Sequence, residues 1–386
     1  MTMTPIYLDH NATTPVDPDV LQAMLPYLRG QFGNPSSAYA LGRYARDAVE
    51  SARADVASLI GAGADEIVFT SGGTESSNIA IAGTSRRAPE KRAVVTTAIE
   101  HPATESVCAL LARRGHDVRR IAPDANGQVP AAAMIDAIDD ATGLVTMIHA
   151  QNETGVLQPV EEVAHASRRK NVLVHIDAAQ SAGKIALDVR RIGVDFVTIA
   201  GHKLYAPKGV GALYVRRGVR FDPVLVGAGQ EQGRRPGTEN VAGIVALGRA
   251  CAIAAERLQR DLERLTMLRD RLLHALVREI PNLKHVGHSV ERLPNTLNVL
   301  FPQVSGRKLL ENCPRVFAST GSACHADRED PSTILLAMGI SSDEALGAVR
   351  LSVGRYTSEQ DVDDAAAALA SAWRLMTGAK PATTAA

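Results

Sequence analysis

Short apolar runs alternate with stretches of helical periodicity through the middle of the chain, between residues 65 and 220. The runs are rich in Val and Ile: "DEIVFT", "RAVVTTAI", "TGLVTMIHA", "NVLVHID", "VDFVTIA" and "GVGALYV". Short strands separated by helices are typical of βαβ units, which build a parallel sheet covered by helices. The pattern therefore predicts an α/β fold with a mostly parallel sheet.

The length of the chain predicts two domains, because 386 residues exceed what one ordinary hydrophobic core supports. A long helical stretch at residues 242–280, as one helix or two, is expected to join them. Strand-like runs such as "NTLNVLF" and "AVRLSVG" follow, mixed with helices. We expect a large α/β domain over residues 16–258 and a smaller α+β domain over residues 259–376, against which residues 1–15 pack. Residues 377–386 are expected to form a flexible tail.

Charge and cysteine content exclude several classes of protein. Lys plus Arg and Asp plus Glu number 42 each, so the zero net charge provides no general attraction to nucleic acid or anionic membranes. No apolar run approaches the roughly 20 residues of a membrane helix, and the N-terminus lacks a signal-peptide pattern, so we expect a cytoplasmic protein. The cysteines lack metal-ligand or paired spacing, which predicts free thiols rather than a zinc site or disulfides: Cys108, Cys251, Cys313 and Cys324.

Functional side chains are expected where the strands end, because open parallel sheets bind ligands at the carboxyl ends of their strands. After "EIVFT", the stretch Ser71-Gly72-Gly73-Thr74 leads into a helix whose N-terminus suits a phosphate group. The alternative is an ordinary capping box with Thr74 as the cap. The loop matches neither GxGxxG nor a P-loop, so NAD and ATP are not favoured.

The other strand ends carry polar side chains of complementary chemistry: His101, Asn152, Asp177, Gln180 and Lys203. Lys203 is either a solvated loop lysine or an amine able to condense with a carbonyl. Asp177 ends an apolar run, where a carboxylate needs a partner because burying it alone is costly. His101 either stacks on a planar ring or caps a helix. Together these groups suit pyridoxal phosphate: the lysine forms a Schiff base with the aldehyde, the aspartate pairs with the pyridinium nitrogen, and Gln180 bonds the ring hydroxyl.

A thiol and two arginines complete the candidate set. Cys324 lies in the polar, Gly- and Ser-containing "TGSACHADRED", where an accessible thiol can act as a nucleophile once deprotonated. The alternative is an inert small hydrophobe, the role of most cysteines. Arg350 and Arg355 in "RLSVGR" suit a substrate carboxylate, which a guanidinium holds through two parallel hydrogen bonds, with surface ion pairs as the alternative. The Gly-rich "GAGQEQGRRPGTEN", which contains Thr238, suits anion contact across a dimer interface.

Nine motifs, in order, resemble those of class V pyridoxal-phosphate enzymes: "YLDHNATTP", "FGNPSS", "FTSGGTESSN", "NETG", "HIDAAQS", "GHKLYAPKG", "RRPGTEN", "GSACHA" and "RLSVGR". More narrowly, the chain resembles cysteine desulfurases of the NifS/IscS-like group and the related selenocysteine lyases, over residues 6–360. The resemblance implies a fold-type I homodimer, with a mostly parallel seven-stranded sheet and the cofactor near the subunit interface.

The resemblance also implies a role for each candidate residue. Lys203 is the lysine that holds the cofactor and then acts as general base, Cys324 is the nucleophile, and His101 stacks on the ring. The implied cofactor contacts are Gly73, Thr74, His101, Asn152, Asp177, Gln180, His202, Lys203 and, from the other subunit, Thr238. The implied substrate contacts are Asn34, Arg350 and Arg355.

The reaction implied by the resemblance removes sulfur from L-cysteine, leaving L-alanine and a persulfide on Cys324. An acceptor protein then takes the sulfur, for example for iron–sulfur cluster assembly. A selenocysteine lyase acting on L-selenocysteine is the alternative, because the serine that IscS-type desulfurases carry two residues before His202 is here Ala200. An aminotransferase of the same fold would not need Cys324, and a non-catalytic sulfur-handling scaffold would bind no cofactor.

Overall fold

A computed structural model describes residues 5–321 and 330–380 of the chain. The main sheet has seven strands in the order β2-β8-β7-β6-β5-β3-β4. The strands are β2 (Ile67–Thr70), β3 (Ala93–Thr97), β4 (Asp117–Ile121), β5 (Thr142–Ile148), β6 (Leu173–Asp177), β7 (Phe196–Ala200) and β8 (Gly211–Val215). All neighbours pair in parallel except β8, which is antiparallel to both β2 and β7. The expected α/β fold with a mostly parallel sheet is confirmed.

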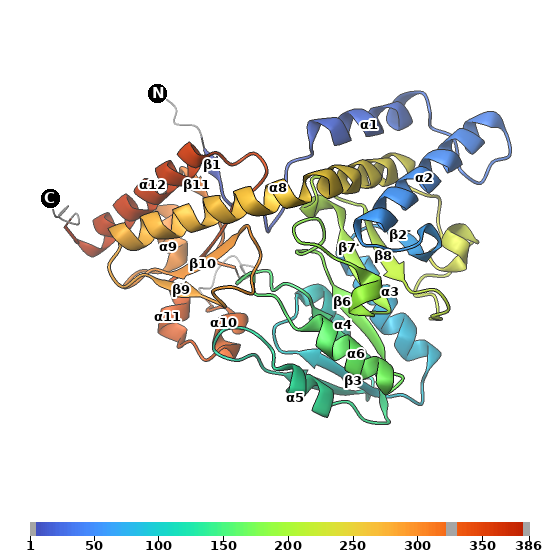
Figure 1. The fold of residues 1–386 in the computed structure, drawn as a ribbon, viewed down its shortest axis with the longest axis horizontal. Coiled ribbons are helices and arrows are strands. Elements are labelled where there is room, and N and C mark those ends of the chain that lie inside the picture. The colour runs from blue at the N-terminus through green and yellow to red at the C-terminus, as the bar shows by residue number, and fades with distance from the viewer. Residues whose placement is uncertain (1–4, 322–329, 381–386) are drawn as a thin grey trace.

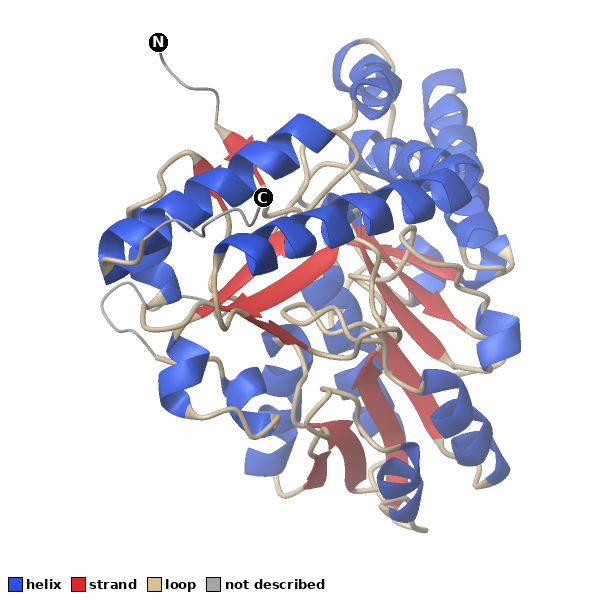
Figure 2. Cartoon of the chain, turned by 60° about the vertical axis from the view of Figure 1, so that its left-hand side comes forward, coloured by secondary structure: helices blue, strands red, loops and turns tan. Residues whose placement is uncertain are grey.

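Helices lie on both sides of the strands (Figures 1 and 2). The longer helices are α1 (Pro18–Arg29), α2 (Ala40–Leu59), α3 (Gly73–Arg87), α4 (Pro102–Arg113), α6 (Val160–Arg169), α8 (Val241–Glu279) and α12 (Glu359–Thr377). The shorter helices are α5 (Ala131–Asp136), α7 (Val189–Ile192), α9 (Gly306–Glu311), α10 (Thr333–Ala337) and α11 (Ser342–Leu346). Single 3-10 turns are η1 (Ala64–Glu66), η2 (Gly201–Lys203) and η3 (Gln230–Gly233).

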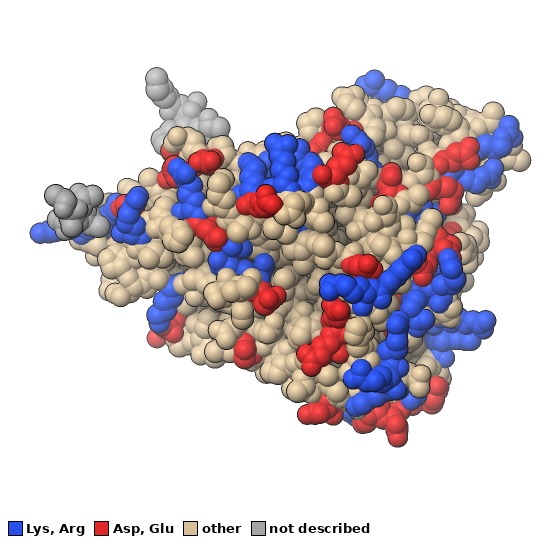
Figure 3. All heavy atoms as spheres, viewed as in Figure 1, with Lys and Arg blue, Asp and Glu red and all other residues tan. Residues whose placement is uncertain are grey.

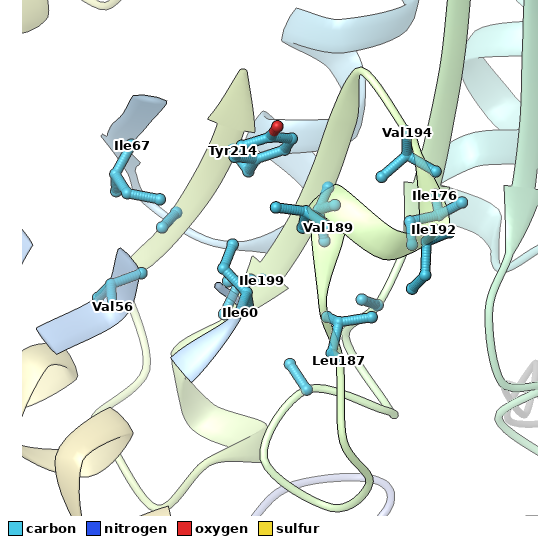
Figure 4. Close-up of a cluster of buried hydrophobic side chains, with 14 of the residues drawn as sticks. Val56, Ile60, Ile67, Ile176, Leu187, Val189, Ile192, Val194, Ile199 and Tyr214 are labelled. Atoms are coloured by element: carbon cyan, nitrogen blue, oxygen red, sulfur yellow. The ribbon is translucent and has the colours of Figure 1, made fainter. Parts of the chain in front are cut away.

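Both faces of the main sheet are buried. Successive side chains of a strand point to opposite faces, so one strand contributes to two cores. Ile199 of β7 enters a core that also contains Val56 of α2 and Ile60 just after it. Figure 4 shows these three side chains close together. Phe196 of the same strand belongs to a different cluster, with Ile79 of α3. Burial on both faces explains why the strands read as continuous apolar runs.

Helix α8 joins the two halves of the molecule as a single helix of 39 residues. Its first half contributes Ile244 and Leu247 to the core under the main sheet. Its second half contributes Leu268 and Leu272 to a separate core. Figure 1 shows α8 crossing the upper part of the molecule from one half to the other. The helical stretch predicted at 242–280 is therefore one helix, whose first half packs in one hydrophobic core and whose second half packs in the other.

The second half of the molecule contains a three-stranded antiparallel sheet, β12-β10-β9, and a parallel pair, β1-β11. Strands of both contribute side chains to the second core. These strands are β1 (Ile6–Tyr7), β9 (Lys284–Val286), β10 (Thr296–Leu300), β11 (Val316–Phe317) and β12 (Ala348–Ser352). Strand β1 places Ile6 in this core. Asp9 then bridges to Ser352, and the N–H of Thr14 donates to the carbonyl oxygen of His202 at 3.0 Å. The N-terminal segment thus connects the second core to the edge of the main sheet where β7 ends.

The surface carries charge of both signs. Figure 3 shows Lys and Arg side chains interspersed with Asp and Glu over the visible face. No helix in the described ranges is long and apolar enough to cross a membrane. Over the same residues, no group of three or more His, Cys, Asp and Glu side chains is arranged to hold a metal ion.

Candidate active site

Parallel strands of the main sheet end at one edge, and the candidate residues follow directly after them. In strand order these residues are His101 after β3, Asn152 after β5, Asp177 at the end of β6 and Lys203 after β7. The strands are in register at this edge, since Asp177 pairs with Ile148 of β5. The charge of Asp177 raises the pKa of both His101 and Lys203, as expected for groups that lie at the same end of the sheet.

The amine of Lys203 is held by the N-terminal segment rather than by solvent. Its Nζ donates to the carbonyl oxygen of Ala12 at 2.8 Å and also to that of Asn11. Burial and the cation of Arg350 lower the pKa of Lys203 to about 8, against the opposing charge of Asp177. A lysine with this pKa is partly neutral near physiological pH, so it can act as a nucleophile or base. These contacts favour the reactive amine over the solvated loop lysine.

Asp177 is a buried carboxylate, 5% exposed, without an ion-pair partner in the described part of the chain. Its Oδ1 accepts a hydrogen bond from the N–H of Ala179 at 2.9 Å. Burial raises the pKa of Asp177, while that hydrogen bond and the charges of His101 and Lys203 lower it. A cation placed against a buried carboxylate stabilises its charged form. The protonated ring nitrogen of pyridoxal phosphate is such a cation, so the residues present fit that cofactor.

His101 is the N-cap of α4, with Nδ1 accepting a hydrogen bond from the N–H of Ala103 at 3.1 Å. Because Nδ1 accepts, the proton of the neutral ring is on Nε2. Burial and the cation of Lys203 lower the pKa of His101, with Asp177 opposing, so the imidazole is neutral at neutral pH. The capping role uses only the edge of the ring. Its faces stay available for stacking on a planar cofactor, so the two alternatives for His101 are compatible.

The turn after β2 presents backbone N–H groups at the same edge of the sheet. Helix α3 begins at Gly73, its N-cap Gly72 has φ 149°, and no side chain caps this end. The capping-box alternative, with Thr74 as the cap, is therefore wrong. Among the described residues, the N–H groups of Gly73 and Thr74 have no hydrogen-bond partner, which is the arrangement that binds a phosphate. Gly211 of β8 permits the turn, since a Cβ there would lie 2.7 Å from Cα of Gly72.

The end of β7 contributes a neutral imidazole and a methyl group. Nδ1 of His202 lies 3.2 Å from Oγ1 of Thr13, and burial helps to lower the pKa of His202 to about 4. The methyl group of Ala200 faces the turn at α3: a Cβ added to Gly73 would lie 3.5 Å from it. Ala200 therefore places a methyl group, not a hydroxyl, against the phosphate-type turn.

Two amide side chains, Gln180 and Asn152, flank the residue whose carbonyl holds Lys203. Nε2 of Gln180 donates to the carbonyl oxygen of Asn11 at 2.9 Å. Nδ2 of Asn11 in turn donates to the carbonyl oxygen of Asn152 at 3.3 Å. Both expected cofactor contacts are thus linked to Lys203 through Asn11.

Arg350 reaches the site from the small sheet. It is buried, and its Nη2 donates to Oδ1 of Asp9 at 2.7 Å while its Nη1 donates to the carbonyl oxygen of Asn152 at 3.0 Å. Its Nε is buried without a hydrogen-bond partner in the described part of the chain. One donor of Arg350 is therefore left for a ligand such as a carboxylate.

Arg355 lies in a separate ion-pair network. Its Nη1 is 2.7 Å from Oδ2 of Asp17, its Nε is 3.4 Å from Oδ2 of Asp261, and its guanidinium carbon lies 4.3 Å from the centre of the Tyr205 ring. Carboxylates of the chain itself thus occupy both edges of this guanidinium. The structure makes Arg355 a structural residue, which corrects the expectation that it binds substrate.

Asn34 and Thr238 do not join this site within the single chain. Both are exposed, Asn34 between α1 and α2 and Thr238 on the loop before α8. The Oδ1 of Asn34 accepts a hydrogen bond from the N–H of Ser36 at 2.9 Å. Neither side chain hydrogen-bonds to Lys203 or Asp177 in the described ranges, so their expected roles require a second subunit.

Cys324, the expected nucleophile, lies outside the described residues. The remaining cysteines are free and buried: Cys108, Cys251 and Cys313. Burial raises the pKa of each of these thiols, and that of Cys108 reaches about 12. A buried thiol with a raised pKa is a poor nucleophile. The three described cysteines therefore have structural roles.

Sequence reasoning missed three residues of this site: Asp9, Asn11 and Lys184. Asp9 and Asn11 belong to the polar motif "YLDHNATTP", which carried the resemblance but was given no role. Lys184 follows "HIDAAQS" by a short turn, and its Nζ donates to Oε1 of Gln180 at 2.8 Å. The signal for Asp9 and Asn11 was polar sequence inside a motif, whereas Lys184 lies outside the quoted motifs. Their function depends on contacts made by residues far apart along the chain.

Comparisons with known proteins give consistent results. A family model described as aminotransferase class-V matches residues 6–364. A cysteine desulfurase from Nostoc sp. is 44% identical over 363 residues, which cover 94% of this chain and 91% of the relative. The cysteine desulfurase NifS from Azotobacter vinelandii is 42% identical over 364 residues, which cover 94% of this chain and 90% of the relative. A solved structure described as a NifS-like protein superposes with a TM-score of 0.90 at 35% identity, over 97% of this chain and 100% of that one.

Proposed function

This chain belongs to the aminotransferase class-V family, and on that premise we propose that it is a cysteine desulfurase dependent on pyridoxal phosphate. The observation that carries the proposal is the placement of Asp177 and Lys203 at the ends of the neighbouring strands β6 and β7. An amine of lowered pKa lies beside a buried carboxylate that has no ion-pair partner of its own in the described part of the chain. The names of the relatives supply the substrate, L-cysteine.

Each residue of the site has a distinct task in this proposal. When bound, pyridoxal phosphate supplies an electron sink for charge that develops at the α-carbon of the substrate. Asp177 stabilises the protonated ring nitrogen, His101 covers a ring face, and the turn at Gly73 binds the phosphate. Lys203 removes the α-proton as a neutral base, and the carbonyl of Asn11 then accepts a hydrogen bond from the resulting ammonium.

Sulfur leaves through Cys324. The thiolate of Cys324 attacks the sulfur of cysteine, a sulfur–sulfur bond forms, and the carbon–sulfur bond breaks. The electron pair of the broken bond stays on the β-carbon of the substrate, which takes up a proton. The ammonium of Lys203 returns a proton to the α-carbon, so L-alanine and a persulfide are the products. The raised pKa values of the described thiols support Cys324 as the nucleophile, because Cys108, Cys251 and Cys313 are buried.

Arg350 is proposed to hold the substrate carboxylate. Its buried Nε has no partner among the described residues, and its Nη2 is shared with Asp9. A carboxylate that bonds Nε and Nη2 would be gripped through two parallel hydrogen bonds. This contact orients the substrate through its α-carboxylate, a group that cysteine and selenocysteine share.

The experiment that tests the proposed function measures L-alanine formed from L-cysteine and, side by side, from L-selenocysteine. We expect alanine from cysteine, with an equal amount of sulfur as persulfide or sulfide, since the relatives are named cysteine desulfurases. Alanine from selenocysteine alone would favour the lyase alternative, which the Ala200 position motivates. A keto acid without alanine would favour an aminotransferase.

Capture of pyridoxal phosphate by the cofactor-free protein should accelerate as the pH rises through about 8, the lowered pKa of Lys203. Below that pH the amine is mostly protonated and cannot attack the aldehyde, and above it the amine is mostly neutral. The rate should rise roughly tenfold per pH unit on the acidic side and then level off. Stopped-flow absorbance of the bound cofactor measures it. A rate that continues to rise past an ordinary lysine pKa of about 10.4 would contradict the assignment.

We further propose a homodimer in which each subunit completes the site of its partner. Thr238 and Asn34 are exposed in the single chain, as residues that serve a partner's site should be. Large apolar side chains are exposed on the neighbouring loops: Val226 is 96% exposed and Phe32 72%. Burying such side chains favours association.

The variant Val226→Lys should shift the protein from dimer towards monomer in sedimentation equilibrium, because a charge replaces apolar surface at the proposed interface. Val290→Lys is the matched control, since Val290 is also a highly exposed valine but lies in the second half of the molecule. A wild-type protein that stays monomeric at all concentrations would contradict the dimer, and equal dissociation of both variants would contradict an interface at Val226.

We propose that the persulfide passes to a thiol-bearing acceptor protein in the cytoplasm, with iron–sulfur cluster assembly as the destination. A reducing compartment keeps the attacking thiol free, as this chemistry requires. Transfer of labelled sulfur from the loaded enzyme to a purified scaffold protein tests this step. Release of all the label as free sulfide, with none on the scaffold, would argue against it.

A further inference from the structure

Lys184 carries a buried amine that no carboxylate of the described residues neutralises. It is 9% exposed, and in the described part of the chain its Nζ makes one hydrogen bond, to Oε1 of Gln180 at 2.8 Å, and no salt bridge. Burial, together with the cations Lys203 and Arg350, lowers the pKa of Lys184 to about 7. A buried amine among cations lowers the stability of the fold. A residue of this kind at a ligand site indicates a functional role.

Lys184 determines which end of the Gln180 amide faces the site. Nζ of Lys184 donates to Oε1 of Gln180, so the oxygen end of the amide faces the lysine. Nε2 then faces the opposite way and donates to the carbonyl oxygen of Asn11 at 2.9 Å. The same carbonyl accepts a hydrogen bond from Nζ of Lys203. The contacts therefore form an unbroken series from Lys184 through Gln180 and Asn11 to Lys203.

The backbone packs the two ends of this series against each other. Gly183, directly before Lys184, has φ +71°, in the left-handed region that favours glycine. A Cβ at Gly183 would lie 2.4 Å from Cδ2 of Leu204, the residue directly after Lys203. The turn that carries Lys184 is thus in direct contact with the loop that carries the reactive amine, and no side chain fits between them.

We propose that Lys184 is a positioning residue: by holding Gln180, it fixes the carbonyl of Asn11 as the acceptor for the amine of Lys203 whenever that amine is not bonded to the cofactor. The inference rests on the proposed function, in which Lys203 alternates between holding the cofactor and removing a proton. Nε2 of Gln180 carries two hydrogens, so one bonds Asn11 and the other remains for a ring oxygen. A reversed amide would instead turn its oxygen towards the Asn11 carbonyl and repel it.

A double-mutant cycle on the cofactor-loaded enzyme tests the proposal. Lys184→Met should lower kcat for L-cysteine about tenfold, the change expected when one charge-assisted hydrogen bond is lost. The KM should change by less than about twofold, because Lys184 contacts no group assigned to the substrate. In the Gln180→Ala background the same substitution should have no further effect, since Lys184 acts through Gln180. Additive losses would overturn the proposal.

A second variant tests the direction of the amide. Gln180→Glu keeps an acceptor for Lys184 but removes the donor to Asn11, so kcat should fall as it does in Lys184→Met. An unchanged kcat would overturn the proposal. Lys170→Met is the matched control, because Lys170 is an exposed lysine whose Nζ bonds the carbonyl oxygens of Ile135 and Ile138. It should leave both kcat and KM unchanged.

The melting temperature of the cofactor-free protein separates positioning from a structural role. Lys184→Met should melt at the same temperature as the wild type or higher, because methionine fills similar space without a buried charge. A lower melting temperature combined with an unchanged kcat would mean that Lys184 only supports the fold. Failure of the wild-type protein to bind pyridoxal phosphate would instead contradict the proposed function. Failure of the positioning role and failure of the proposed function are therefore distinguishable.

Discussion

The variant Lys203→Ala should lose turnover of L-cysteine by about 10⁴-fold and should lack the absorbance band of a lysine-bound Schiff base when it is given pyridoxal phosphate. The loss is large because one amine has two tasks. Its lowered pKa, about 8, suits both the attachment of the cofactor and the removal of the α-proton. Alanine release and an absorbance spectrum of the same sample measure the two tasks.

Lys208→Ala is the control for the Lys203 variant. Lys208 is an exposed lysine five residues further along the same loop, so its removal should leave both turnover and the absorbance band intact. A Lys203→Ala protein that keeps a band like that of the wild type would show that another amine holds the cofactor. In that case the mechanism proposed for this site would be wrong.

The variant Cys324→Ala should lose sulfur release from L-cysteine by at least about 10³-fold while its cofactor band stays the same as that of the wild type. The thiolate of Cys324 is proposed to take the sulfur, and alanine cannot form a persulfide. Binding of pyridoxal phosphate uses Lys203 and Asp177 and does not require the thiol. Sulfide assay, persulfide labelling and absorbance of one preparation separate the two functions.

Cys313→Ala is the matched control for the thiol. Cys313 is buried in the second core and its pKa is raised, so this variant should lose some stability but keep sulfur release. Equal loss of persulfide labelling in both variants would contradict the assignment to Cys324. Full sulfur release by Cys324→Ala would indicate direct release of sulfide without a protein thiol.

The main sheet could be predicted from sequence because its buried strands carry an unbroken apolar signal. Strand β7 is covered on both faces, and four of its five side chains are apolar. Strand β4, by contrast, lies at the edge of the sheet and contains Asp117, Arg119 and Arg120. An edge strand is half exposed, so its composition resembles that of a loop. The pattern of apolar runs therefore missed β4.

The candidate site could be predicted only in part. Lys203, Asp177 and His101 follow strand ends, and a parallel sheet brings such ends together by its topology alone. Asn11 reaches the site from a different core, through the pairing of β1 with β11, and no local pattern reports a contact of that sequence separation. The predicted substrate-binding role of Arg355 was wrong for the same reason, because its ion-pair partner Asp17 lies far away in the sequence.

Reduction of the cofactor-loaded protein with borohydride, followed by peptide mass analysis, tests the central claim most directly, because it makes the bond between the protein and the cofactor permanent. The account predicts a phosphopyridoxyl group on Lys203 alone, with Lys184 and Lys208 unmodified. A modified peptide that carries any other lysine, or no modified peptide from a preparation that turns over cysteine, would contradict it.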